Sequence, residues 1–186
     1  MRSKVVLFVC GAPGVGKTTV LRGLLDPWST SLVEKPKWTI SGEYGLVGHY
    51  TNGLHDGGDT LAYNGAAEAM DYMEGTLFKR DGLRYFILDG DRFTARSAMA
   101  RVERMPEALM GCVHLTASEE TLLARRSQRN TTQNPTWMKG RKTKASRFAA
   151  MFHTMCLHIE TDGLEASQIT RMIHDKCVND LQAHIA

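Results

Sequence analysis

The sequence predicts an α/β fold, with a parallel sheet of about five strands and helices on both of its faces. Apolar runs of strand length recur along the chain, and segments of helical character separate them. The 186 residues suffice for a buried core, so we expect a single domain over residues 1–186. No run reaches the ~18 apolar residues of a membrane span, and the first apolar run is too short for a signal peptide. These features predict a cytoplasmic protein.

The expected strands are the apolar runs at 4–10, 85–89, 109–116 and 156–160, and 43–48 is a further candidate. The first run, KVVLFVC, ends at a glycine and leads through a turn into a helix that we expect to end near Asp26. Further helices are predicted at about 64–79, 94–104, 118–129 and 165–182. Ser118 precedes two glutamates, which is typical of a helix start because the serine side chain caps free N–H groups.

The turn after the first strand holds the most specific motif. It matches G-x-x-x-x-G-K-[ST] over Gly11, Ala12, Pro13, Gly14, Val15, Gly16, Lys17 and Thr18, and Thr19 follows. Its glycines let successive N–H groups turn toward phosphate oxygens, and the following helix adds partial positive charge. We expect Lys17 to reach the β and γ phosphates of ATP and Thr18 to ligate Mg²⁺. The sequence therefore predicts a three-layer P-loop fold that binds ATP and Mg²⁺.

A carboxylate ends the strand predicted at 85–89. Asp89 is expected to lie beside the P-loop and to hold Mg²⁺ directly or through water, as the carboxylate of a Walker B strand does. Asp91, two residues later, is a candidate to share the metal or to polarise a nucleophile, and Arg92 is a candidate phosphate contact. The alternative is that these carboxylates only cap the next helix.

Positive charge is concentrated in one segment. Between residues 121 and 159 there is no acidic residue, whereas eight cationic residues lie there: Arg125, Arg126, Arg129, Lys139, Arg141, Lys142, Lys144 and Arg147. Arg125 and Arg129 are candidate catalytic residues, because the lid arginines of small P-loop kinases close over the transferring phosphoryl group. We expect a lid over about 125–147, with 130–135 as a surface loop. The alternative is a helix with favourable charges at its C-terminus and a solvated basic face.

A glycine-rich stretch at 48–63, GHYTNGLHDGGDTLAY, fits neither a strand nor a helix. In small P-loop kinases the corresponding segment lies across the cleft from the P-loop and holds the acceptor. Asp59, or otherwise Asp56, would then accept the proton of an attacking hydroxyl. Tyr50, Tyr63 or His49 would contact a planar ring. Alternatively, this is a flexible loop in which Asp59 caps the next helix.

The class of P-loop protein follows from what the chain lacks. It has no N-K-x-D guanine signature and no room for the extra modules of helicases or transporters, which favours a small kinase. Adenylate kinases resemble it in length, in the P-loop and in the Asp89-Gly90 pair. They usually continue with proline and arginine, however, where this chain reads Asp91-Arg92. Their acceptor is already charged and needs no base, so a carboxylate in the acceptor loop favours an alcohol.

A closer resemblance is to the phage kinases that phosphorylate 5-hydroxymethyluracil in DNA, a step in thymine hypermodification. Four blocks, about a quarter of the chain, carry it: the P-loop at 11–18, the stretch at 48–63, LDGDRF at 88–93 and WMKGRKTKASRF at 137–148. The resemblance implies ATP, Mg²⁺ and a base within DNA as the acceptor.

The basic segment favours a polymeric anion on separate grounds. A nucleotide lid needs two or three cations, and this segment carries eight. Aromatic residues flank the densest part, which fits phosphate neutralisation combined with stacking on bases. We therefore expect Trp137, Lys139, Arg141 and Lys142 to contact DNA, whose acceptor base would be flipped out or single-stranded. The alternatives are a kinase of a free nucleotide or small alcohol, and an ATP-dependent DNA-binding module without transferase activity.

Overall fold

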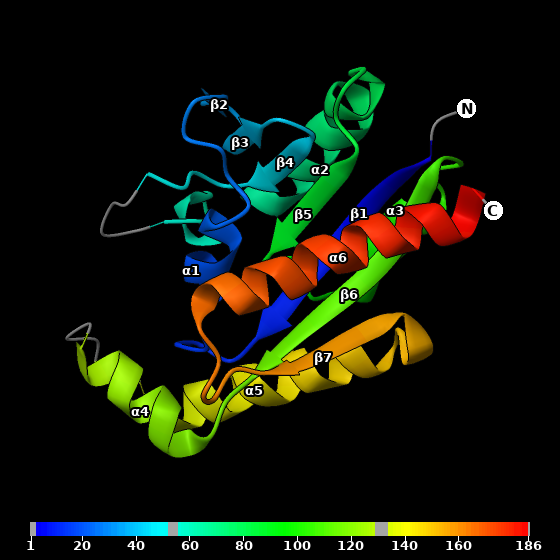
Figure 1. Ribbon diagram of the computed structural model, residues 1–186. Coiled ribbons are helices and arrows are strands. Elements are labelled where there is room, and N and C mark those ends of the chain that lie inside the picture. Colours follow the sequence, from blue (N-terminus) through cyan, green and yellow to red (C-terminus); the bar gives the residue numbers. More distant parts are fainter. Residues whose placement is uncertain (1–2, 52–55, 129–133, 186) are drawn as a thin grey trace.

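The computed structural model describes residues 3–51, 56–128 and 134–185, with side chains up to residue 180 in the last helix. Over these residues the chain forms one sheet of seven strands in the order β2-β3-β4-β5-β1-β6-β7 (Figure 1). The strands are β1 (Lys4–Gly11), β2 (Thr30–Val33), β3 (Trp38–Ser41), β4 (Tyr44–Val47), β5 (Tyr85–Asp89), β6 (Ala108–Thr116) and β7 (Cys156–Glu160).

Five neighbouring strands, β4, β5, β1, β6 and β7, are parallel, which confirms the predicted parallel α/β sheet. The sequence prediction missed β2 and β3, which extend the sheet from β4 by antiparallel pairing. Both are only four residues long, and β3 is buried along its whole length, so it shows no polar-apolar alternation.

The helices are α1 (Lys17–Arg22), α2 (Gly65–Gly75), α3 (Arg96–Glu103), α4 (Glu119–Gln128), α5 (Pro135–Ala150) and α6 (Ala166–Ile185), with 3-10 turns η1 (Gly58–Thr60), η2 (Leu77–Lys79) and η3 (His153–Met155). The helix after the P-loop is shorter than expected: it ends at Arg22, with Gly23 as its C-cap, and not near Asp26. Ser118 caps α4 as predicted, since its Oγ accepts a hydrogen bond from the backbone N–H of Thr121.

Helix α5 occupies a segment that we expected only as a basic lid. Asn134 caps it by accepting hydrogen bonds from the N–H groups of Thr136 and Trp137, and Pro135 stands at its first position. Ala145, Phe148 and Ala149 bury one side of the helix against the sheet. The C-terminal part of α5 therefore packs in the core, whereas residues 135–144 of the predicted lid are exposed or half-buried. The expected surface loop falls largely on residues 129–133, outside the described part of the chain.

The helices form two layers, one on each face of the sheet (Figure 1). Along β1, Val5 and Leu7 pack toward α1 and α6, whereas Val6 and Phe8 pack toward α2, α3 and α5. The ring of Phe8 lies 5.4 Å from that of Phe148 in α5, in an edge-to-face arrangement. This packing holds the carboxyl ends of β1 and β5 side by side, at the edge where ligands bind in open α/β folds. None of the helices described is apolar over a stretch long enough to span a membrane.

Candidate active site

The P-loop joins the end of β1 to the start of α1. Gly16 stands directly before α1 with a φ of 102°, in the left-handed region that glycine tolerates without strain. The ammonium group of Lys17 folds back over the loop and donates hydrogen bonds to the carbonyls of Gly11, at 3.0 Å, and Ala12, at 3.4 Å. The loop thus has the strand-turn-helix setting that the motif requires.

Asp89 ends β5 and pairs in register with Val9 of β1, which places it beside the P-loop. Only 4% of its surface is exposed. Its Oδ2 accepts hydrogen bonds from the Tyr50 hydroxyl, at 3.1 Å, and from the Gly58 N–H, at 3.2 Å. Burial raises the pKa of this carboxyl, while Lys17 and the two hydrogen bonds act in the opposite direction.

The second oxygen of Asp89, Oδ1, is buried and has no hydrogen-bond partner among the described residues. A buried carboxylate oxygen without a donor is costly unless a cation or water satisfies it. The Thr18 hydroxyl and the Asp89 carboxylate both lie next to Gly57. A Cβ added to Gly57 would stand 2.9 Å from Asp89 Oδ2 and 3.3 Å from Thr18 Oγ1, so these two oxygens are close to each other. An alcohol oxygen and a carboxylate oxygen that lie close together beside the P-loop suit the binding of a Mg²⁺ ion.

The glycines of the stretch 48–63 allow its backbone to approach the Walker carboxylate. A Cβ on Gly58 would come 2.4 Å from the Asp89 carbonyl oxygen, and a Cβ on Gly48 would come 2.0 Å from the carbonyl oxygen of Gly57. Arg92 secures the same turn, because its Nη1 donates to the Gly58 carbonyl at 2.8 Å. The described part of this stretch is therefore a tight turn packed on the P-loop edge.

The three aspartates proposed from the sequence as bases have different surroundings. Asp56 forms an ion pair with Arg22 of α1 and accepts a hydrogen bond from the Thr51 N–H at 2.6 Å. Asp91 pairs with Arg141 and, at 3.4 Å, with Lys144. Asp59 lies exposed in η1, and its negative charge contributes to the raised pKa of Asp89. Among the described residues, Asp59 alone of the three has no cationic partner.

The aromatic candidates of the same stretch differ in how far they are exposed. Tyr50 is buried with its hydroxyl on Asp89, and burial is the main reason why its pKa lies well above the usual range. His49 is buried as well, with Nε2 2.8 Å from the Val33 carbonyl oxygen. Tyr63, in contrast, exposes 91% of its surface. Of these three rings, only that of Tyr63 is open to a substrate.

Arg125 reaches back from α4 to the nucleotide loop. Its Nη1 donates to the Val15 carbonyl at 2.9 Å and to the Thr161 hydroxyl at 3.0 Å. Its neighbour Arg126 is buried against the P-loop, where a Cβ on Gly14 would lie 3.0 Å from its Cγ. Arg129, the other arginine expected in catalysis, lies outside the described residues.

The cations of α5 point in different directions. Arg141 stacks on Trp137, with its guanidinium 4.9 Å from the ring centre, and also pairs with Asp91. Lys142 lies 3.5 Å from Glu119 of α4. Lys139 is exposed beside a cavity between α3 and α5. The residues grouped together from the sequence are thus distributed over three sides of one helix.

Sequence reasoning missed one residue that shapes the site, Arg22, and assigned another, Tyr50, to a different role. Arg22 pairs with Asp56 and so holds to α1 the stretch at 48–63, which we call the acceptor stretch after the role expected for it. The position of Arg22, six residues after Gly16, gave no signal of this contact. Tyr50 was expected to face the substrate, but it supports Asp89 from within the core. The sequence alone does not indicate whether a tyrosine in a glycine-rich stretch faces the substrate or the core, because its orientation depends on how the turn packs in the fold.

Comparison with protein families matches residues 6–152 to the family AAA_33, described as an AAA domain. The chain belongs to this family. The match covers the P-loop, Asp89, the acceptor stretch and α5 of this AAA domain protein. A comparison with curated protein sequences gives no match.

Solved structures resemble the AAA domain protein in fold. A fungal RNA kinase is 17% identical with a TM-score of 0.59, over 96% of this chain and 86% of that one. The tunicamycin resistance protein of Deinococcus radiodurans is 17% identical with a TM-score of 0.54, over 93% and 95%. A gluconokinase from Sinorhizobium meliloti is 15% identical with a TM-score of 0.51, over 98% and 94%. At these identities the likeness shows the P-loop kinase-like fold.

Proposed function

We propose that this AAA domain protein is an ATP-dependent kinase that phosphorylates the hydroxymethyl group of 5-hydroxymethyluracil in DNA. The observation that carries the kinase assignment is the placement of the acceptor stretch. Gly57 and Gly58 pack directly on Asp89 and Thr18, and this contact brings Asp59 to the P-loop edge. A carboxylate without a cationic partner among the described residues, held at a phosphate site, suits an acceptor that must lose a proton.

The transfer step assigns one role to each group. The acceptor hydroxyl oxygen forms a bond to the γ-phosphorus of ATP, and its proton passes to the Asp59 carboxylate. The bond from the γ-phosphorus to the bridging oxygen breaks, and ADP leaves with the electron pair. Lys17 and Arg125 stabilise the negative charge on the phosphates. Thr18 and Asp89 would hold Mg²⁺, which neutralises phosphate charge when bound.

The choice of acceptor rests on three supports. The sequence blocks at 48–63, 88–93 and 137–148 resemble the phage 5-hydroxymethyluracil DNA kinases. Tyr63, four residues after Asp59 in the sequence, offers an exposed ring on which a flipped-out pyrimidine would stack. The residues expected to contact DNA, such as Trp137 and Lys139, lie on the exposed side of α5.

The test incubates the protein with γ-labelled ATP, Mg²⁺ and separate acceptors. These are DNA containing 5-hydroxymethyluracil, the same DNA with thymine, free 5-hydroxymethyl-2′-deoxyuridine and its monophosphate, and gluconate. We expect label on the hydroxymethylated DNA alone. Label only on a free nucleotide or sugar acid would overturn the DNA acceptor and keep the kinase. ATP-dependent DNA binding without labelling of any acceptor would overturn the kinase assignment.

The base is tested by Asp59→Asn, with Asp56→Asn and Asp91→Asn as matched variants. We expect Asp59→Asn to lower the transfer rate by about 100-fold or more, within the range reported for general acid–base groups. The other two variants remove ion-paired carboxylates and should lower it far less. Transfer that survives Asp59→Asn but is lost in Asp91→Asn would move the base to the loop after β5.

A further inference from the structure

A groove of about 560 Å³ separates α3 from α5, on the face of the sheet opposite α1 and α6. Residues that begin α3 form one wall, and the outer side of α5 forms the other. We call it the α3–α5 groove. Its volume lies in the range of sites that hold organic ligands. The lining that matters here comprises Thr94, Arg96, Lys139, Lys144, Arg147 and Phe148.

All the charged residues that line the α3–α5 groove are cationic. Arg96, Lys139, Lys144 and Arg147 line it, and no aspartate or glutamate does. Arg96, Lys139 and Arg147 are exposed and have no carboxylate partner among the residues that the structure describes. This contrasts with Arg141 and Lys142 of the same helix, which are paired with acidic residues. Unpaired cations held close together repel one another, so an anion in the groove would stabilise them.

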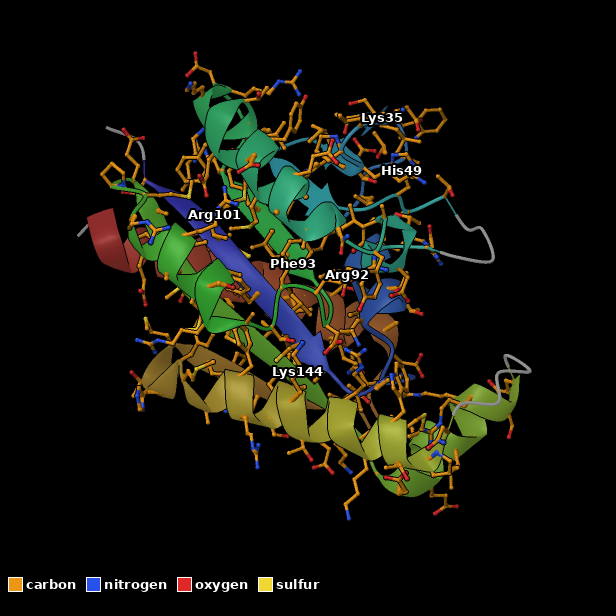
Figure 2. The ribbon with its side chains drawn as sticks, turned by 180° about the vertical axis from the view of Figure 1, so that it is seen from behind. Lys35, His49, Arg92, Phe93, Arg101 and Lys144 are labelled. Carbon is orange, nitrogen blue, oxygen red and sulfur yellow. The ribbon has the colours of Figure 1, made fainter. Side chains whose placement is uncertain are left out.

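The inner end of the groove meets the loop that follows Asp89. Lys144 donates a hydrogen bond to the Asp91 carbonyl at 2.8 Å, and the Thr94 hydroxyl donates to the same carbonyl at 2.8 Å. Figure 2 shows Lys144 of α5 facing the loop with Arg92 and Phe93. Two residues that line the groove therefore bond to Asp91, which follows Asp89 by two positions in the sequence.

The spacing of the cations indicates a repeating anion. Lys139 and Arg147 lie eight positions apart on one helix, which corresponds to about 12 Å along its axis. A single phosphate cannot reach both ends, whereas a strand with a phosphate on every nucleotide can. Met151, which is half-buried, also lines the groove, and its apolar side chain suits the sugars and bases between those phosphates.

We propose that the α3–α5 groove holds the DNA strand that carries the acceptor base, with its phosphates on Arg96, Lys139 and Arg147. The choice of DNA as the partner rests on the proposed function. Arg96 lies outside the basic segment of the sequence and enters the binding surface only through the fold. Arg141 and Lys142, expected from the sequence to bind DNA, contribute less because acidic residues already neutralise them.

The test compares the triple variant Arg96→Gln, Lys139→Gln, Arg147→Gln with a control that removes three exposed cations elsewhere, Lys79→Gln, Arg104→Gln, Arg171→Gln. Binding of a fluorescent single-stranded 12-nucleotide DNA is measured by anisotropy between 0.05 and 0.5 M salt. Three lost phosphate contacts should reduce the slope of log Kd against log salt by about 2, and weaken binding about 100-fold at 0.1 M salt. The control should change neither value. Thermal unfolding checks that both variants fold.

Each outcome decides one question. Equal slopes for the triple variant and the unaltered protein would overturn the groove, even if hydroxymethylated DNA is phosphorylated. Loss of binding in the triple variant, in a protein that never phosphorylates such DNA, would keep the groove as a DNA surface and overturn the proposed function. Tighter binding of an RNA of the same sequence, lost in the triple variant, would overturn DNA as the partner.

Discussion

At Asp89 the two oxygens of one carboxylate differ in their surroundings. Oδ2 accepts hydrogen bonds from Tyr50 and Gly58, whereas Oδ1 is buried and lacks a partner among the described residues. Burial also raises the pKa of the group, so the ionised form strains the ligand-free fold. Both properties fit a residue arranged for a cation, because a bound Mg²⁺ satisfies the free oxygen and favours the ionised form.

Asp89→Asn is expected to separate stability from activity. A folded-state pKa raised above the unfolded value means that stability is fully present below the unfolded pKa and declines as pH rises through the folded pKa. The asparagine avoids this decline, so we expect the ligand-free variant to unfold at an equal or higher temperature near pH 7, with a smaller difference near pH 4. Transfer should fall by about 100-fold or more, since the metal ligand is lost.

Thermal unfolding at several pH values, without nucleotide, measures the first effect, and labelled transfer measures the second. Glu103→Gln, which removes an exposed carboxylate from α3, is the control. An Asp89→Asn protein that is less stable than the unaltered chain at pH 7 would show that the carboxylate supports the fold and not a metal.

Tyr50→Phe keeps the buried ring and removes the hydroxyl that donates to Asp89. Because this hydrogen bond lowers the pKa of Asp89, its loss should raise that pKa further. We expect the acidic limb of the rate profile to shift to higher pH and the rate near pH 6 to fall about tenfold, as for a lost hydrogen bond to a charged group. A pH profile that matches that of the control variant Tyr72→Phe would contradict a positioning role for Tyr50.

At the scale of single elements, the acceptor stretch depends on close backbone contacts. Its turn lies between Gly48 on one side and Asp89 and Thr18 on the other, with no room for added Cβ atoms. Arg22 and Arg92 hold the same turn from α1 and from the loop after β5. A segment whose regular structure is limited to the short turn η1 thus gains a defined position from its contacts with α1, β5 and the loop after β5.

Gly57→Ala tests this contact against Gly42→Ala. Both glycines have positive φ, at 68° and 54°, but nothing lies within 4 Å of a Cβ on Gly42, whereas a Cβ on Gly57 meets Asp89 and Thr18. Gly42→Ala should therefore cost only about 1 kcal/mol of stability from backbone strain, and transfer should persist. Gly57→Ala should also abolish measurable transfer. Equal transfer by the two variants would show that the turn does not define the site.

At the scale of the whole molecule, the nucleotide loop links both ends of the fold. Arg125 of α4 joins the Val15 carbonyl to Thr161, which follows β7, and the sheet holds β1 between β5 and β6. A ligand on the P-loop therefore binds next to segments that come from both the N-terminal and the C-terminal parts of the chain. Binding at such a position stabilises the folded state as a whole.

We expect ATP with Mg²⁺ to raise the unfolding temperature. At 100 times Kd, binding adds about 2.7 kcal/mol, which corresponds to about 5–10 °C for a chain of this size. Lys17→Ala should remove most of the shift, and chelation of Mg²⁺ should reduce it in the unaltered protein. An equal shift in Lys17→Ala would place nucleotide binding outside the P-loop.

The parts of the fold that were predictable are those with local signals. The buried parallel strands, the P-loop and Asp89 follow from apolar runs, glycine spacing and a carboxylate at a strand end. β3 was missed because its four buried residues carry no periodic pattern, and β2 was missed because its four residues, none of them buried, form no apolar run. The ion-pair partners of Asp56 and Asp91 lie 34 and 50 positions away, at Arg22 and Arg141, and Arg96 lines a groove with cations of α5. Only the packing of α1, α3 and α5 brings these residues together.

Different sides of α5 make different contacts, and this has an evolutionary consequence. Its buried side belongs to the core, its inner cations hold the loop after Asp89, and its outer side lines the α3–α5 groove. Changes on the outer side alter neither the packed face nor the phosphate loop. Under the proposed function, the choice of acceptor can therefore diversify through a few exposed codons while the phosphate loop is retained, and the same codons are the natural targets for a directed library.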